Sequence, residues 1–505
     1  MLSRYFAWSG AALLLCSCSV LLTEYQRPEL PVVDSYEGAA EYVGEELAAS
    51  FWEGFNDPLL NAAVEKALSN NYDLAVSAVN VQKALVTLNI ARTDYHPTVD
   101  SSVGVEASRA LSYHDSTHKS SSSNFGVSYE ADLFGKITAD NLAALENYRA
   151  TAYDYLAMRL TIINSVAEAY WQYAYAKESE ALGYKDLEDS SRRVELVKGQ
   201  FLSGAVNIVD LDTARINHLT VEQTLNERRD AVKQARTALD ALLGITADQD
   251  VEIATLADAK LPEFNLDIPA RLLARRPDLM EAEAELRSAL ASYDEARLAF
   301  FPDFTLSASL AAGGTNTLGR FLSDPVGALG AAITLPFFNF NELTLEKESA
   351  LKDEDAAKLE FVSTYINAVK EIYDEISSIE LYKLTEENAM MQFSLSERNY
   401  SRYYERYRLG LSPLSDLLDA ADSLRSSENA LILSRRNLLQ SYMALMIAAG
   451  GDTEFAMEDF VLLKDEDKSS GQQQEETSSA DKVSAETVSP ETDAESSASE
   501  SASVE

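Results

Sequence analysis

Acidic residues that recur just after two similar turns are the first candidates for chemistry. The stretches QFLSGAVNIVDLDTARI (Gln200–Ile216) and RYRLGLSPLSDLLDAADSL (Arg406–Leu424) each place an aspartate-leucine step shortly after a glycine. Asp210 follows the first turn, and Asp416 and Asp419 follow the second. A carboxylate at such a place can cap the positive end of a new helix. Repeated around an axis, it can instead attract cations and repel its own copies. The residues alone leave both interpretations open.

The helix-cap interpretation has support at both turns. Asn207 and Asp210 have the spacing of a capping box, in which each side chain accepts a hydrogen bond from the other backbone amide. Ser412 followed by Pro413 predicts an N-cap and a proline in the first turn, which places Asp416 near the positive helix end.

Residue patterns for catalysis or metal binding are missing from the sequence. His96, His114, His118 and His218 do not form a ligand cluster, and His114 and His118 lie four apart in a predicted solvated loop. We find no zinc-type cysteine pair, phosphate-binding glycine loop or nucleophile elbow in the sequence. We therefore expect no catalytic residue, no metal and no cofactor.

The chain is strongly acidic. Its 505 residues include 82 Asp and Glu against 42 Lys and Arg, for a formal net charge of −40. A chain without a basic surface cannot displace the counterions of phosphates, which argues against nucleic acid as a partner. The hydrophobic fraction of 46% predicts a folded body, either two or three domains or one elongated one.

The two ends differ from this body. Arg4, the apolar stretch Ala11–Leu15 and then Cys16 and Cys18 are typical of a targeting segment, too short to cross a bilayer as a helix. We expect a signal peptide at residues 1–17. Leu15-Cys16-Ser17-Cys18 resembles a bacterial lipoprotein cleavage box, which makes Cys18 the candidate acylated residue; a plain secretory signal is the alternative. Residues 464–505 are acidic and poor in large apolar residues, so a disordered tail is predicted.

The body is a tandem duplication. The segment from Asn71 parallels the segment from Arg276, with Pro97 matching Pro302 at an offset of 205 (302 − 97). Gly204 matches Gly410 at an offset of 206 (410 − 204), and so little drift indicates duplication rather than chance. The predicted units are an N-terminal segment at 18–70, a first repeat at 71–260 and a second repeat at 261–463.

Each repeat predicts the same order of elements. An amphipathic helix stops at an aromatic-proline pair, and two strands of period two, a very long helix, a glycine turn and a shorter returning helix follow. We expect the long helices at about 136–201 and 342–409, and the returning helices at 207–243 and 413–449. Heptad seams predict coiled-coil packing of both long helices, at Leu145, Tyr148, Ala152, Tyr155, Arg159, Ile162, Val166, Ala169, Tyr173 and Ala176, and at Tyr365, Val369, Ile372, Ile376 and Ile379. The predicted fold is mainly α with a small β part of four strands.

Four strands are too few to close on themselves, because about eight form the smallest workable barrel. An open sheet leaves two edges of unpaired backbone groups, which lipid cannot satisfy. If lipid surrounds the sheet, several chains must contribute strands to one barrel, and a trimer supplies twelve. A structural periplasmic coiled-coil lipoprotein is an alternative that needs no closed barrel, and a soluble enzyme lacks a candidate site.

The stretch RRPDLMEAEAELRSALASYDEARLAFFPDFTLSASLAAGG resembles the hallmark of the TolC-type outer-membrane efflux channels, lipoprotein branch. CSVLLTEYQRPELPV and FWEGFNDPLLNAAVEKALSNNYDL match the same branch, and the resemblance covers about Cys16–Phe460. It implies a lipid-anchored homotrimer in the outer membrane of a Gram-negative bacterium, with a twelve-stranded barrel and a helical periplasmic tunnel. It also implies a periplasmic adaptor and an inner-membrane resistance-nodulation-division transporter as partners, and conduction rather than catalysis. The outer-membrane duct of a type I protein secretion system is the alternative function.

By the same resemblance, the hairpin tips form the periplasmic entrance. The motif SDLLDA places Asp416 and Asp419 in a ring of carboxylates at the narrowest point, and Asp210 is the first-copy equivalent of Asp416. Tyr407 matches a tyrosine that takes part in closing the entrance. The basic gate partner of some members falls at Ser412 here, so a salt-linked latch at that point is not implied.

Overall fold

The computed structural model describes residues 21–31, 50–109, 118–246, 251–263, 276–314 and 325–451, which belong to one compact unit. The side chains of His118 and Phe337 are outside this description. The predicted signal peptide with Cys18, the loop residue His114 and the predicted acidic tail also lie outside the described residues.

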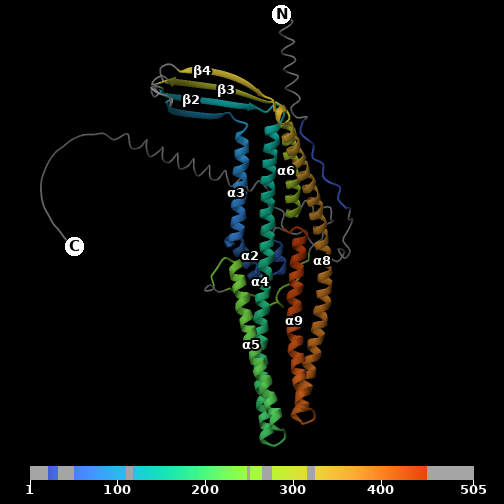
Figure 1. The fold of residues 1–505 in the computed structure, drawn as a ribbon. Coiled ribbons are helices and arrows are strands. Elements are labelled where there is room, and N and C mark those ends of the chain that lie inside the picture. The colour runs from blue at the N-terminus through green and yellow to red at the C-terminus, as the bar shows by residue number, and fades with distance from the viewer. Residues whose placement is uncertain are drawn as a thin grey trace, which may run out of the picture. The chain divides into compact units, whose positions relative to one another are not determined.

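Helices dominate the described part of the chain, with one small sheet at one end of a helical bundle (Figure 1). The first half contains the 3₁₀ helix η2 (Phe51–Phe55), α2 (Pro58–Asn70), α3 (Tyr72–Thr93), β1 (Thr98–Ser108), β2 (His118–Ala131), α4 (Lys136–Leu202) and α5 (Ile208–Leu242). The second half contains α6 (Pro277–Leu298), β3 (Asp303–Gly314), β4 (Val326–Thr334), the 3₁₀ helix η4 (Pro336–Asn339), α8 (Phe340–Arg408) and α9 (Leu414–Ala448). The prediction of a mainly α fold with a small β part is confirmed.

The duplication is visible in the lengths of the helices. α3 and α6 have 22 residues each, α4 and α8 have 67 and 69, and α5 and α9 have 35 each. At 1.5 Å per residue, each long helix spans about 100 Å. The predicted long and returning helices are confirmed to within a few residues, because prolines, glycines and periodicity mark their ends locally.

The sheet has the antiparallel order β1-β2-β3-β4, so the predicted four strands are present and β1 and β4 form its edges. The predicted loop at His118 was wrong, since the strand β2 begins at that residue. The serines that follow it have weak strand preference, but they pair with β1 and β3 on both sides, as Ser122 does with Gly104 and Gly313. His118 therefore lies in a strand and not in the predicted loop.

Both hairpins turn at a glycine in the left-handed conformation, Gly204 with φ of 76° and Gly410 with φ of 72°. In each turn the amide after the glycine donates to a carbonyl of the last helical turn, as Leu411 N does to Arg406 O at 2.8 Å. These bonds complete the same helix-ending motif in both repeats.

The core lies where η2, α2 and α9 pack around the middle of α4. Phe55 and Trp171 are fully buried there, with ring centroids 4.9 Å apart. The predicted seam of α8 is buried throughout, but that of α4 is only part of a wider buried surface, because α4 contacts α2, α3, α5, α6 and α9. Four seam positions of α4 are only partly buried: Leu145, Tyr155, Arg159 and Ala169.

Exchanging the turn glycine tests the geometry of the hairpins. Gly410→Ala should lower the free energy of unfolding by about 1–2 kcal/mol, because an L side chain disfavours the left-handed conformation. Gly199 provides the matched control, since it lies inside α4 and, like Gly410, has open space where a Cβ would stand. Gly199→Ala should raise the free energy of unfolding by up to about 1 kcal/mol. Thermal and urea unfolding measure both, and equal effects of the two variants would contradict the assignment.

Candidate functional site

The tips of the two hairpins pack on one another through a hydrophobic cluster. Val197 of α4 and Leu211 of α5 come from the first hairpin, and Tyr407 of α8 and Leu417 of α9 come from the second. All four side chains are buried. Apolar burial therefore holds the two tips together within one chain.

Tyr407 is the polar member of this cluster. Its side chain is only 4% exposed, and its hydroxyl has no hydrogen-bond partner among the described residues. Burial, and secondly the negative charge of Asp210, raises the pKa of Tyr407. The phenol stays neutral and keeps a proton to donate, close to a carboxylate of the other hairpin.

Asp210 forms the predicted capping box. Asp210 N donates to Asn207 Oδ1 at 3.1 Å, and Asn207 N donates to Asp210 Oδ2 at 3.2 Å. The first turn therefore follows the helix-cap interpretation in full.

The second turn follows it only at Asp416, which lies in the first turn of α9, near the positive helix end. Pro413 takes the N-cap position of α9 without a side-chain cap bond, and Ser412 Oγ is buried without a partner among the described residues. The expectation of a Ser412 cap was wrong, because Pro413 is extended and moves Ser412 one residue too far from the amides of the first turn. Asp416 is half-buried in that turn and Asp419 is exposed one turn later. Neither carboxylate forms an ion pair within the described residues.

The sheet at the other end of the bundle has one apolar and one polar face. The row Val99, Val127, Ala308 and Leu329 crosses all four strands on one face. The neighbouring row, Thr98, Ser128, Ser307 and Gly330, crosses them on the other. Apolar side chains are strongly exposed in the single chain, with Leu329 at 89%. Such a sheet suits a boundary between lipid and water.

The polar face continues into a hollow of about 350 Å³ where the strands meet the helices. Thr98, Ser128 and Glu130 of the strands line it together with Asp140 of α4 and Glu295 of α6. Burial and the charge of Asp94 raise the pKa of Asp140, and burial and the charge of Asp140 raise the pKa of Glu295. The carboxylates thus repel one another across the junction.

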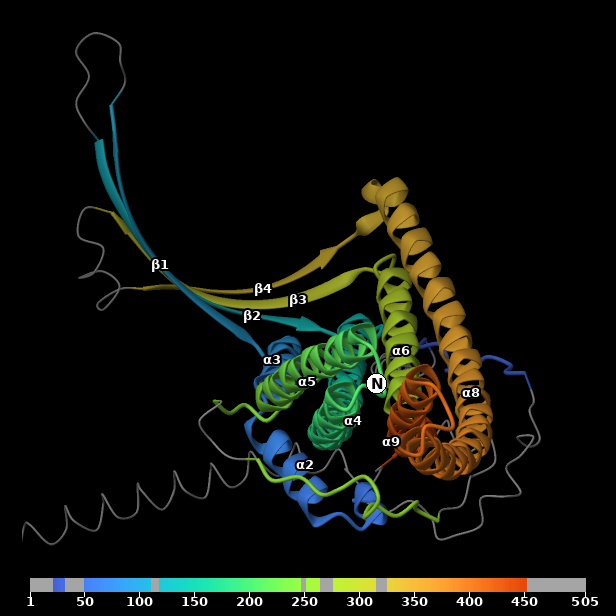
Figure 2. The same cartoon turned by 90° about the horizontal axis from the view of Figure 1, so that it is seen from below.

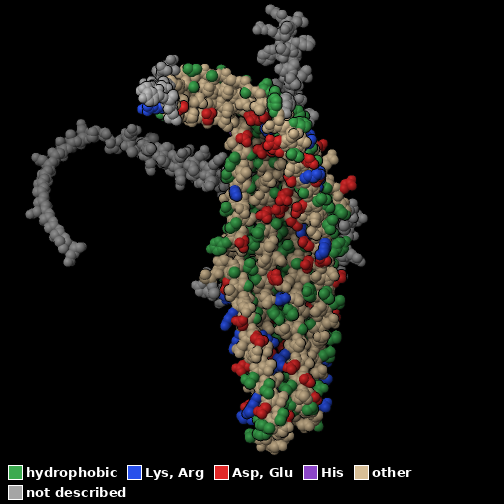
Figure 3. All heavy atoms as spheres, in the orientation of Figure 1, with side chains coloured by type: hydrophobic (Ala, Val, Ile, Leu, Met, Phe, Trp, Pro, Cys, Tyr) green, Lys and Arg blue, Asp and Glu red, His purple; other side chains and the backbone are tan. Residues whose placement is uncertain are grey.

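Further carboxylates lie along the helices below the sheet, where Figure 3 shows acidic side chains gathered in the upper half of the bundle. Burial, and then the charges of Asp154, Glu285 and Asp278, raises the pKa of Glu281 to about 7. Among the described residues no group of three or more His, Cys, Asp or Glu side chains is arranged to hold a metal ion. The arrangement suits a polar, negatively charged surface rather than a coordination site.

Residues 21–31 form an extended strap along α6. Thr23 N and Oγ1 donate to Asp294 at 2.6 and 2.7 Å, and Arg27 pairs with Glu283 at 2.6 Å. Leu21 O accepts a bond from Arg297. The six residue steps from Leu21 to Arg27 span up to about 20 Å, and the fourteen residue steps from Glu283 to Arg297 span about 21 Å along a helix. The strap therefore runs antiparallel to α6 in matching register.

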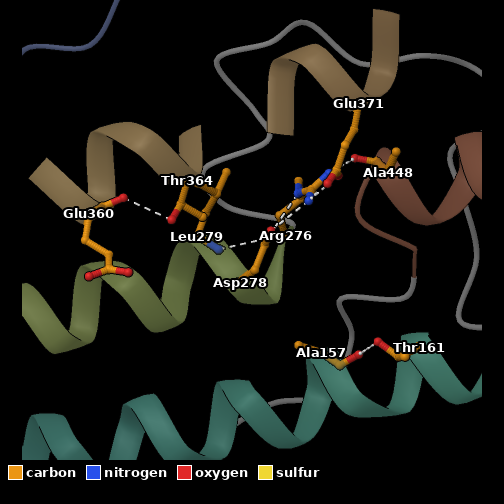
Figure 4. A network of polar contacts seen from close by, with 9 residues as sticks. All are labelled: Ala157, Thr161, Arg276, Asp278, Leu279, Glu360, Thr364, Glu371 and Ala448. Atoms are coloured by element: carbon orange, nitrogen blue, oxygen red, sulfur yellow. Dashed lines mark hydrogen bonds and ion pairs between the residues drawn. The ribbon is translucent and has the colours of Figure 1, made fainter. Parts of the chain in front are cut away.

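The returning helices end against the short helices of their own repeats. Asn71, before α3, donates to Leu242 O of α5 at 3.2 Å. Arg276, before α6, donates to Ala448 O of α9 at 2.9 Å and pairs with Asp278 and Glu371, each at 2.7 Å (Figure 4). In the second repeat the Arg276 side chain thus joins α6, α8 and α9. In the first repeat the corresponding joint is one hydrogen bond, from the side-chain amide of Asn71 to α5.

Sequence reasoning missed both the strap and these joints. Arg276 lies in the RRPD stretch, but its partners Glu371 and Ala448 are 95 and 172 residues away. The signal available in the sequence is an arginine directly before Pro277, a residue suited to the start of a helix, and the structure shows that this arginine is buried.

Two helices present exposed apolar side chains at heptad spacing. On α3 these are Tyr72, Val76, Val79, Val86 and Ile90, and on α8 they include Leu345, Leu359 and Ile366. By length and composition α3 is also apolar enough to cross a membrane, which by itself is weak evidence. Heptad spacing is instead typical of a helix-packing surface.

Comparisons with known proteins agree with this architecture. The family described as "Outer membrane efflux protein" matches the chain at residues 63–245 and again at 268–451. The chain is 30% identical over 460 residues to "Antibiotic efflux pump outer membrane protein ArpC" of Pseudomonas putida, covering 87% of this chain and 94% of that protein. It is 24% identical over 447 residues to "Probable outer membrane lipoprotein SilC" of Salmonella typhimurium, covering 87% and 96%. Its fold is similar to that of the CmeC outer membrane channel of Campylobacter jejuni, with a TM-score of 0.80, 24% identity and coverage of 88% and 98%.

The acidic surface predicts a pH dependence of stability that Glu281 controls. The folded protein holds the Glu281 proton more tightly than the unfolded chain does, because its folded pKa of about 7 exceeds the ordinary value of 4.5. Its stabilising effect is complete below that ordinary value and is lost as pH rises through about 7. The Tm should therefore fall between acidic and mildly alkaline pH, and fall less in Glu281→Gln. Glu222→Gln, an exposed change on α5, should keep the wild-type profile, and parallel profiles for all three proteins would refute the assignment.

Proposed function

The chain belongs to the outer membrane efflux protein family, and on that premise we propose that it is the outer-membrane channel of a tripartite efflux system. It is an outer-membrane protein with a TolC-like fold. In the proposed role it is a passive conduit that carries small molecules from a periplasm-spanning pump to the exterior.

The observation that carries this proposal is the two-faced sheet continuous with an acidic hollow. Lipid accepts the exposed apolar face, and the polar face leads into the carboxylate-lined junction with the helices. A purely structural coiled-coil lipoprotein has no need of such a sheet. Conduction therefore explains a feature that the scaffold alternative leaves without a role.

A homotrimer would provide partners for the open strand edges and the exposed helix seams of the single chain. β1 and β4 are the open edges of the sheet, so β4 of one copy can pair with β1 of the next and three copies make twelve strands. The helices α3 and α8, which carry exposed seams, lie on two sides of the bundle, α3 next to β1 and α8 next to β4 (Figure 2). In a closed trimer, β4 of one copy would pair with β1 of the next, and α8 of the first copy would pack against α3 of the same neighbour.

A passive conduit needs an energy source elsewhere. We find no phosphate-binding loop in the sequence, so ATP or ion coupling would belong to a partner protein. The proposed partners are a periplasmic adaptor and an inner-membrane resistance-nodulation-division transporter. The type I secretion duct would use the same architecture with a different transporter, and no contact among the residues that the structure describes favours it. The proposed units remain residues 71–260 and 261–463 for the two repeats.

We place the periplasmic gate at the hairpin tips. Three copies of Asp416 and Asp419 near one axis would repel one another and favour cations. The hydrophobic cluster opposes that repulsion by holding each pair of tips together. Tyr407 and Asp210 are assigned a second, electrostatic role in closing, since the buried hydroxyl is near enough to this carboxylate of the other hairpin for its charge to raise the pKa of Tyr407.

The strap supports the acylation of Cys18. Leu22 lies beside Gly135, which caps α4 directly after the strand β2. Cys18 is four residues before Leu22 in the sequence, and four residues of chain can span at most about 14 Å. An acyl chain on Cys18 would then enter lipid next to the strands.

Planar-bilayer recordings test the conduit and its gate together. Purified protein that light scattering shows to be trimeric should give small, cation-preferring conductances. Asp416→Ala with Asp419→Ala should lower the conductance and the cation preference several-fold, because it removes the repulsion that opposes closure and the charge that concentrates cations at the tip. Asp212→Ala on the exposed face of α5 is the matched control and should change little. A monomer in light scattering would end the conduit proposal, while unchanged conductance in the double variant would remove only the gate.

The anchor is tested separately by mass spectrometry of the mature N-terminus. Acyl groups should appear on Cys18, and Cys18→Ser should yield no acylated peptide. Replacing Arg27 by alanine should leave acylation intact, because the strap positions the anchor and does not take part in its attachment. An unmodified N-terminal peptide from the membrane fraction would refute lipidation.

A further inference from the structure

Four charged side chains converge between the two hairpins, well above the tips. Asp186 of α4 pairs with Arg228 of α5 at 3.4 Å, with side chains 15% and 16% exposed. Burial raises the pKa of Asp186, while the charges of Arg425 of α9, Arg228 and Arg193 of α4 oppose that rise. A hollow of about 450 Å³, lined by α4, α5 and α9, lies beside them and includes Asp186, Arg228 and Arg425 in its walls.

The three arginines have few other partners. Arg193 is 3% exposed and donates to Tyr400 of α8 at 3.2 Å and to Asn217 Oδ1 of α5 at 3.5 Å, and its Nε has no partner among the described residues. Arg228 also donates to Ser179 O at 2.9 Å. Burial, and the like charges of Arg193 and Arg228, lower the pKa of Arg425 even though Asp186 opposes them. The guanidiniums therefore repel one another, and Asp186 is the carboxylate they share.

We propose that Asp186 is a positioning residue for the gate, and that its charge holds α9 of the second hairpin against α4 and α5 of the first. Without this carboxylate, Arg425 faces Arg193 and Arg228 across the gap between the hairpins. The repulsion then drives α9 outward. Arg425 lies eleven residues, or about 16 Å, above the start of α9, so the movement is passed to the tip that carries Asp416 and Asp419.

Other charges near the cluster do not replace Asp186. Asp422 pairs with Arg425 from the outside and is 57% exposed. Glu428 of α9 is near Lys185 and Arg228, but burial and the charges of Asp186 and Glu397 of α8 raise its pKa. Asp189 pairs with Arg192 on the surface at 3.5 Å. Asp186 is the one for which Arg193, Arg228 and Arg425 all act as counterions.

The inference rests on the proposed conduit, and charge rescue tests it. In bilayers the trimeric Asp186→Asn variant should show a several-fold higher mean conductance than wild type. Adding Arg425→Gln should return the conductance toward wild type, because it removes the repulsion that the first change exposes. Asp186→Glu should behave as wild type, and so should the surface control Glu188→Gln.

A purely structural role predicts the opposite for the double variant, which would then be more disturbed than either single change. Conductance of Asp186→Asn equal to wild type, or a double variant that stays as open as Asp186→Asn, would overturn the proposal.

Hydrogen–deuterium exchange provides a readout that does not depend on conduction. Amides in the first half of α9 should exchange faster in Asp186→Asn and recover in the double variant. If wild-type protein conducts no ions, the proposed function fails, but the exchange comparison still decides the role of Asp186. Unchanged exchange in Asp186→Asn would overturn that role even if the protein conducts.

Discussion

A four-stranded sheet that one chain cannot enclose is the constraint on which the structure depends. Its apolar face is exposed, its polar face leads into a carboxylate-lined hollow, and its edges β1 and β4 are open. Backbone groups at an edge in lipid need a hydrogen-bond partner that lipid does not offer. The helices below follow the same constraint, because α3 and α8 expose heptad seams on the flanks that adjoin those edges.

The two repeats share one skeleton but differ in the chemistry of their joints and turns. The first repeat ends its returning helix against the amide of Asn71 and begins it with the capping box of Asn207 and Asp210. The second uses the charged cluster of Arg276 and begins α9 at Pro413 without a cap bond. The two repeats thus share their helix lengths and acidic tip residues, but the helix after the turn lacks a side-chain cap in the second hairpin alone.

Charge has two different roles along the bundle. Below the sheet, carboxylates raise one another's pKa values, as Asp140 does for Glu295, and this suits a surface that faces water and cations. Between the hairpins, arginines outnumber the carboxylate they share, and electrostatic balance there depends on Asp186. The net charge of −40 does not predict this local excess of positive charge, because composition does not say which side chains lie close together.

Local signals in the sequence determined the order and the bounds of the elements. Pro97 and Pro302 mark the ends of helices, Gly204 and Gly410 mark the turns, and the heptad repeat predicts the long helices, since each depends on neighbouring backbone geometry. The same reasoning failed where a tertiary contact opposes a local preference: pairing on both sides extends β2 through its serines, and Pro413 displaces Ser412 from the cap.

Some parts of the candidate site were also predictable from the sequence, and others were not. The positions of Asp210, Asp416 and Asp419 after their turns were readable from spacing, as was the capping box. The strap on α6, the Arg276 joint and the convergence of Asp186 with Arg425 were not, because they join residues about 100 to 280 positions apart. Such contacts depend on how helices pack in three dimensions, and only the tertiary structure decided them.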